Sequence, residues 1–186
     1  MDDVTSTMDR SPELWERPSE VTESRPSGAY GVLEAHTLHL RGTLPTWEVA
    51  DLVAERLGRV IGPERVSASN KLDPAAAMPT SFPIFAKGGT GAFDEGSAHM
   101  GADLTSVLDL VHRLLAVYPA VEVSVRGHLS ECTDDADGAR VARERVRAVS
   151  AYLEFKGTDL RRIHGLVDDR APEARKIELD VHHLLE

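Results

Sequence analysis

The chain has 186 residues, 41% of them hydrophobic, a formal net charge of −10 and a single cysteine. That length accommodates one ordinary domain or two small ones, and the hydrophobic fraction is sufficient for a packed core. The negative charge is repelled by phosphate backbones and anionic lipids, and no stretch approaches the roughly 18–20 apolar residues of a transmembrane helix. The composition therefore excludes, as first expectations, general nucleic-acid binding, a membrane span and an intramolecular disulfide.

Residues 1–28 are acidic, contain several prolines and hold few apolar side chains. Such a segment cannot bury enough surface to offset its ordering entropy, so we predict a disordered acidic tail. It lacks the apolar run of a signal peptide, which leaves a cytoplasmic location open. Leu14 and Trp15 stand out in it, either as lone exposed apolar residues or as a short docking motif.

Residues 29–72 have the pattern of a ββαβ unit. Two extended runs over residues 30–44 alternate apolar and polar side chains, as half-buried strands do. Thr46 and Gly62 then bracket an apolar stripe at helical spacing, with Thr46 as the N-cap and Gly62 as the stop. A third strand is expected at residues 64–69.

Residues 73–81 form a Pro/Ala-rich linker, and residues 82–186 form a second unit. In chain order, the elements expected there are a strand at 84–89, a helix at 102–119, a strand at 121–127, a helix at 138–157 and strands at 159–167 and 175–185. Strands that alternate with amphipathic helices predict the α+β class. We expect two small α/β sandwich units in which helices cover one face of a mixed sheet.

Arg145 does not fit its neighbours in the predicted helix at 138–157. On a helical wheel it lies in the apolar arc, one turn after Val141 and one turn before Val149. An isolated buried charge is costly, so this guanidinium needs a partner or a groove opening. One interpretation is a structural arginine satisfied by a carboxylate or by carbonyls, such as those of the 129–137 loop. The other is a bidentate anchor for a ligand carboxylate.

The stretch around Arg145 resembles a family signature that runs "GHTD…N…LSxxRAxxVxxYL" and ends in "NRRVEI". The positions that match are Gly127, His128, Arg145, Val149, Tyr152 and Leu153. The positions that differ are Leu129 and Ser130 for Thr–Asp, Gly138 for Asn, and Val141 and Ala142 for Leu–Ser. From about residue 82 to residue 185 the chain therefore resembles the OmpA-like domain, a peptidoglycan-associating module of bacterial envelopes.

The resemblance implies a ligand groove. In the family, the Asp and the Arg together bind the diaminopimelate of the peptidoglycan stem, the Arg through a carboxylate and the Asp through an ammonium. Here Ser130 has no charge to neutralise an ammonium, and loss of one partner of a desolvated charge pair costs about 2–5 kcal/mol. The groove implied here consists of Arg145, Ser130, Leu129, Gly138 and Val141. We expect it to be degenerate, with peptidoglycan binding weak or lost.

The first unit has a shorter likeness. Residues 38–69 resemble the BON repeat, in which a strand that ends in Gly precedes a helix and a further strand. BON repeats stand beside OmpA-like domains in some actinobacterial envelope proteins. The alternative is a generic βαβ extension of the second unit.

Other candidate chemistry has weaker patterns. Cys132 lies four residues after His128, but no oxyanion hole accompanies this pair. His182 and His183 are adjacent on a predicted strand and so point to opposite faces, which makes a poor metal chelate. The glycine-rich residues 88–96 lack the Lys–Ser/Thr of a phosphate-binding loop. We therefore predict no enzyme, no metal and no cofactor.

Two functional hypotheses follow. The first is a non-enzymatic, OmpA-like binding module of the bacterial cell envelope, whose partner is a weakly bound peptidoglycan stem peptide or a protein. The second is a cytoplasmic scaffold or assembly protein that uses the same fold for protein–protein contacts. The family implies the envelope, whereas the missing signal peptide favours the cytoplasm.

Overall fold

The computed structural model describes residues 28–186 except 87–92, 95, 129–134 and 169–176. Its elements are β1 (Tyr30–Glu34), β2 (Thr37–Arg41), β3 (Thr43–Leu44), α1 (Trp47–Ile61), η1 (Pro63–Arg65), β4 (Val66–Ala68), β5 (Lys71–Leu72), β6 (Ser81–Ala86), α2 (Ala102–Val117), β7 (Glu122–His128), α3 (Asp135–Phe155), η3 (Leu160–Arg162), β8 (Ile163–Asp168) and β9 (Ile177–His182). The predicted acidic tail, with Leu14 and Trp15, lies outside the described residues. None of the helices in the described ranges has both the length and the apolar character needed to cross a bilayer.

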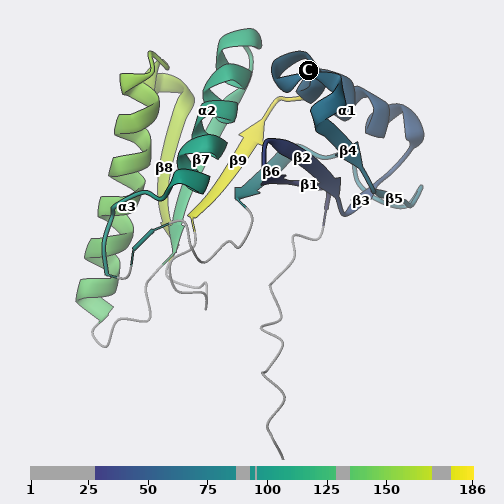
Figure 1. Cartoon of the computed structure of the whole chain (residues 1–186). Helices are drawn as coiled ribbons and strands as arrows, with labels where there is room; N and C mark the ends of the chain where they lie inside the picture. The colour runs from purple at the N-terminus through teal and green to yellow at the C-terminus, as the bar shows by residue number, and fades with distance from the viewer. Residues whose placement is uncertain (1–27, 87–92, 95, 129–134, 169–176) are drawn as a thin grey trace, which may run out of the picture.

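One mixed sheet of seven strands runs through the described part of the molecule, in the order β4-β2-β1-β6-β9-β7-β8 (Figure 1). Helices α1, α2 and α3 pack on the same face of this sheet (Figure 1). Strand pairs β1–β6, β2–β4 and β7–β8 are parallel, whereas β1–β2, β6–β9 and β7–β9 are antiparallel. The predicted α+β class, with helices covering one face of a mixed sheet, is therefore confirmed.

The first unit forms the predicted ββαβ pattern, with β1, β2, α1 and β4 in that order. The backbone N–H of Val49 donates to the Thr46 hydroxyl at 3.4 Å, which satisfies one free donor at the start of α1. Gly62 ends the helix at φ +97°, a conformation that glycine adopts without steric cost. Two short strands that the sequence did not predict as separate elements, β3 and β5, pair with each other.

The two predicted units share one sheet instead of forming two separate sandwiches. Strand β1 of the first unit pairs in parallel with β6 of the second, with Gly31 opposite Ile84. The second unit's first strand begins at Ser81, earlier than the predicted residue 84. The sequence boundaries between the units stay a prediction, but the hydrogen-bonded sheet crosses them.

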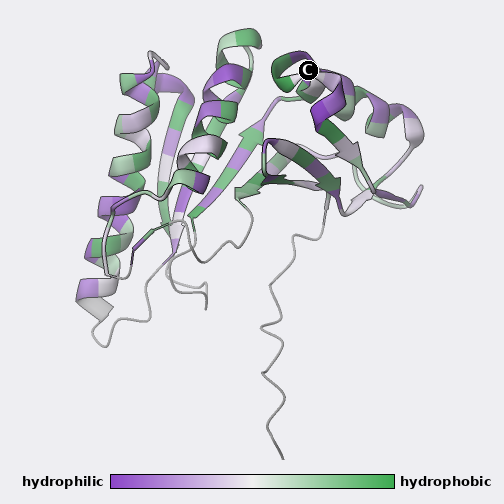
Figure 2. Ribbon diagram, viewed as in Figure 1, coloured by the Kyte–Doolittle hydropathy of each residue, from purple (hydrophilic) through white to green (hydrophobic). Residues whose placement is uncertain are grey.

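The core lies between the sheet and the three helices. The apolar stripe predicted for α2 is buried, and in β7 the buried Val123 and Val125 alternate with polar neighbours. Apolar and polar residues interchange along the helices and strands of this layer (Figure 2). The same alternation in β9 buries Ile177, Leu179 and Val181. Burial of each large aliphatic side chain contributes about 1.5–3 kcal/mol to the stability of the fold, so this layer is its main source.

Two glycines set how closely α3 approaches the sheet. A Cβ atom on Gly127 of β7 would lie 2.7 Å from Val146 Cγ2 and 2.9 Å from the Ala142 carbonyl oxygen. A Cβ atom on Gly165 of β8 would lie 2.8 Å from Val146 Cγ1. Val146 thus packs where two side chains are missing, and this contact fixes the height of the neighbouring Arg145 above the sheet.

Arg162 ties the end of α2 to the edge of the sheet. Its Nη1 donates to the Leu115 carbonyl at 2.8 Å and its Nη2 to the Tyr118 carbonyl at 2.7 Å. Its Nε donates to the Val121 carbonyl at 2.9 Å. A cation at the C-terminus of a helix also interacts favourably with the helix dipole.

We expect Arg162→Ala to lower the free energy of unfolding by about 2–3 kcal/mol, because it removes charged hydrogen bonds to three carbonyls. Arg161→Ala is the matched control, since the neighbouring side chain is 90% exposed and pairs only with Asp159 across the described residues. This control is expected to lose less than about 1 kcal/mol. Urea unfolding measures both variants, and equal losses would contradict the role given to Arg162.

Candidate functional site

Arg145 is fully buried, at 0% relative exposure, on the face of α3 that packs into the core. Its Nε donates to the Ser97 carbonyl at 2.9 Å and its Nη2 to the Asp94 carbonyl at 3.4 Å. The guanidinium carbon also lies 5.0 Å from the centre of the Phe93 ring, within the range of a cation–π contact. Arg145 is therefore engaged by the segment that precedes α2.

The segment that receives Arg145 is itself a formed turn. Phe93 is 2% exposed and forms an isolated antiparallel bridge with Met100. The Ser97 N–H donates to the Asp94 carbonyl at 3.1 Å, and the His99 N–H donates to the Ser97 hydroxyl at 2.9 Å. Two carbonyl oxygens of this turn, which we call the Asp94–Ser97 turn, are thereby directed at the guanidinium.

This arrangement decides part of what the sequence left open. Satisfaction of Arg145 by backbone carbonyls is observed at Ser97 and Asp94. Most of the 129–137 loop, the source expected from the sequence, lies outside the described residues, and its contribution stays a prediction. The carbonyls come from a turn 48 and 51 residues earlier in the chain. Only the guanidinium's unusual place on the helical wheel was visible in the sequence.

The other predicted groove residues are only partly described. Gly138 and Val141 lie on α3 and are buried. Leu129 and Ser130, together with Cys132, lie outside the described residues. The pairing of Ser130 with Arg145 as two halves of a ligand clamp therefore stays a prediction.

A second polar cluster, missed by the sequence reasoning, lies on the sheet face opposite the helices. Arg126 Nη1 lies 3.5 Å from Glu178 Oε2, and its Nη2 lies 3.7 Å from Asp180 Oδ2. His128, only 4% exposed, places its Nε2 3.4 Å from the same Glu178 oxygen. The alternation of β7 and β9 signalled which residues face outward, but not that the two strands align them.

Burial raises the pKa of the Asp180 carboxyl above its usual value, and the negative charge of Glu178 adds to this effect. The charge of Arg126 acts in the opposite direction but does not cancel it. The carboxylates of this cluster are thus held by an ion-pair network. No group of three His, Cys, Asp or Glu side chains in the described ranges is arranged to hold a metal ion.

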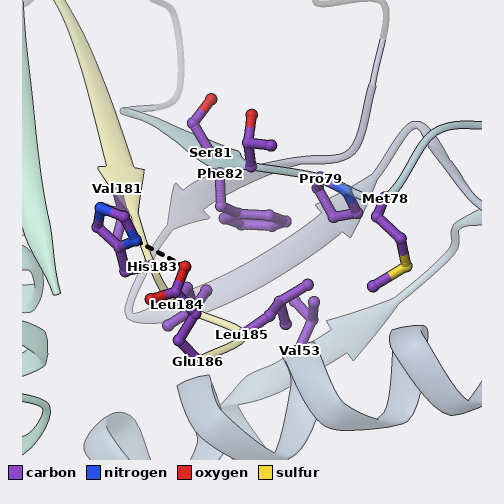
Figure 3. Close-up of a pocket in the computed structure, with 11 residues that line it drawn as sticks. Val53, Met78, Pro79, Ser81, Phe82, Val181, His183, Leu184, Leu185 and Glu186 are labelled. Atoms are coloured by element: carbon purple, nitrogen blue, oxygen red, sulfur yellow. Dashed lines mark hydrogen bonds and ion pairs between the residues drawn. The ribbon is translucent and has the colours of Figure 1, made fainter. Parts of the chain in front are cut away.

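A third feature is a hollow of about 350 Å³ beside the C-terminus, which we call the C-terminal hollow (Figure 3). Val53 of α1, Phe82 of β6 and the terminal Leu184 are among its lining residues. At its edge, His183 Nδ1 lies 2.8 Å from Glu186 Oε1, and this contact raises the pKa of His183. The hollow is mainly apolar and offers space for apolar groups without a converging catalytic set.

Comparisons with known proteins give partial structural likenesses. No protein-family model matches the chain, and no curated protein matches it. The OmpA-like domain of FopA1 from Francisella tularensis aligns at 15% identity with a TM-score of 0.44, over 54% of this chain and 79% of that one. The peptidoglycan-associated lipoprotein from Burkholderia pseudomallei aligns at 17% identity with a TM-score of 0.42, over 49% and 86%. The C-terminal domain of Helicobacter pylori MotB aligns at 14% identity with a TM-score of 0.40, over 49% and 81%.

We expect Arg145→Met to lower the free energy of unfolding by about 2–4 kcal/mol. The substitution keeps much of the apolar volume of the side chain but removes the charged donors that bind the Ser97 and Asp94 carbonyls. Arg143→Met, two residues away on the exposed side of α3, is the matched control and should change stability by less than about 0.5 kcal/mol. Chemical denaturation compares the two, and an Arg145 variant as stable as its control would contradict a structural role.

Proposed function

We propose that this chain is a non-enzymatic binding module of the cell-envelope type, with an OmpA-like second unit and a degenerate peptidoglycan groove. The observation that carries the proposal is the burial of Arg145, whose Nε and Nη2 donate to the Ser97 and Asp94 carbonyls. A guanidinium used in this way stabilises the fold and is not presented to a ligand carboxylate. Binding of the module to its partner then depends on other surfaces.

The sequence supports the same conclusion from the other half of the groove. Ser130 occupies the position of the family's Asp, and a hydroxyl brings no charge to an ammonium group. The groove thus lacks its carboxylate because Ser130 replaces the Asp, and its guanidinium, that of Arg145, is engaged by the Asp94–Ser97 turn. Each loss alone weakens a desolvated charge pair by about 2–5 kcal/mol.

We expect diaminopimelate-type sacculi to retain the protein no better than they retain the Arg145→Met variant. Free meso-diaminopimelate should not release any of the retained protein. Ser130→Asp is the second variant, and it should also leave retention unchanged because Arg145 is still engaged. A pull-down with purified sacculi measures all three proteins. Strong retention that free meso-diaminopimelate removes, or a large gain with Ser130→Asp, would overturn the degenerate groove.

A second candidate function is assembly through protein–protein contacts, and the observation that favours it is the edge strand β8. It ends the sheet, and its Leu166 and Val167 are 49% and 41% exposed. Exposed edges with apolar side chains are templates for pairing with another strand. We infer a second copy of the chain as the partner, because two identical exposed edge strands can pair with each other antiparallel about a two-fold axis.

For this second candidate, we expect the protein to dimerise with rising concentration and Leu166→Lys to weaken the dimer at least about tenfold, since the new charge enters the paired edge. Leu160→Lys is a well-matched control, because Leu160 is also 49% exposed but precedes the strand. Sedimentation equilibrium measures both. A protein that stays monomeric at every concentration, or a dimer indifferent to Leu166→Lys, would rule this candidate out.

A further inference from the structure

A small hollow of about 130 Å³ lies between the β1–β2 turn, the end of α1 and the outer side of α2. The residues that line it are Leu33, His36, Ile61, Arg65, Ser106, Asp109, Leu110 and Arg113. The aliphatic members are buried or half-buried, whereas the basic members are exposed. We call this the basic hollow, because three cationic or imidazole side chains from distant parts of the chain meet around it.

The basic side chains of this hollow are not used by the fold. Across the described residues, neither Arg113 nor His36 forms a hydrogen bond or a close ion pair, and Arg113 acts on Asp109 only through its charge. Arg65 Nε lies 3.9 Å from Glu64 Oε1, at the limit of an ion pair. Two permanent positive charges therefore gather at one concave place on a chain whose net charge is −10.

The carboxylate of Asp109, which also lines the hollow, is committed elsewhere. Its Oδ1 accepts a hydrogen bond from the Tyr152 hydroxyl at 2.9 Å and lies 2.9 Å from Lys156 Nζ. Burial raises the pKa of Asp109, but the hydrogen bonds from Lys156 and Tyr152, with the charges of Lys156 and Arg113, outweigh it and hold the pKa below its usual value. Its negative charge is thus balanced by α3, not by the two arginines alone.

The turn that brings His36 to the hollow has an unfavourable backbone. β1 and β2 are joined by Ala35 and His36, at φ +46° and +71°, with Glu34 opposite Thr37. Two-residue hairpin turns of this kind favour Asn–Gly, and side-chain-bearing residues in the left-handed region store strain. The strained position holds His36, which brings an imidazole ring to the hollow. The glycine that such a turn favours would bring none.

We propose that the basic hollow binds one small oxyanion, a phosphate or carboxylate group. Its size suits a single such group and not a nucleotide, and guanidinium groups bind tetrahedral and planar oxyanions through paired hydrogen bonds. Arg65 and Arg113 supply the charge from two different segments, and His36 adds a ring nitrogen. The aliphatic floor lowers the local exposure to water, which strengthens these contacts.

Inorganic phosphate, titrated into the intact protein at constant ionic strength, tests the site. We expect saturable binding by calorimetry, weakened at least about tenfold in Arg65→Gln and in Arg113→Gln. Arg59→Gln is the matched control, because Arg59 is exposed in the last turn of α1 but is paired with Glu55. It should bind phosphate as the parent protein does.

A parallel titration with acetate separates the two sources of oxyanion. Tighter phosphate binding assigns a phosphoryl ligand, and equal affinities assign a general oxyanion site. Circular dichroism melting verifies that each glutamine variant is folded before its affinity is compared. The proposal is overturned if phosphate and acetate both fail to saturate up to about 20 mM, or if Arg65→Gln and Arg113→Gln, both folded, bind as tightly as Arg59→Gln.

Discussion

The described structure depends on one buried guanidinium. Arg145 lies at 0% exposure between α3 and the Asp94–Ser97 turn, and its hydrogen bonds to Ser97 and Asp94 join segments 48 and 51 residues apart. A buried charge without such donors and acceptors would cost several kcal/mol, so the turn has to be in place for α3 to pack. The close packing of Val146 against Gly127 and Gly165 then fixes the position of the Arg145 guanidinium.

Arg162 solves the same problem at the other end of α2, where it binds carbonyls in the last turn of the helix and just after it. Both arginines donate to backbone carbonyl oxygens, so charged hydrogen bonds hold the two connections around α2. The sheet extends this frame into the first unit through the β1–β6 pair. Other charged side chains gather outside this core, in the Arg126 cluster on the opposite face of the sheet and around the basic hollow.

Local patterns predicted the elements well, because helix and strand periodicities and the caps at Thr46 and Gly62 act over a few residues. The wheel also singled out Arg145. Its partner turn could not be predicted, because backbone carbonyls leave no signature in side-chain identity and the turn is distant in sequence. The joining of the two units in one sheet agrees with the alternative of a βαβ extension, but the sequence could not decide for it, since β1 and β6 pair through the backbone across a long connection.

The central claim is that Arg145 belongs to the fold and is closed to ligands. The most direct test is the solvent exchange of its Nε–H in nitrogen-15 NMR spectra of the intact protein, with the exposed Arg143 as reference. We predict that the Arg145 signal is strongly protected from exchange and does not shift when meso-diaminopimelate is added. An Arg145 Nε–H that exchanges as fast as that of Arg143 and shifts with meso-diaminopimelate would contradict the account.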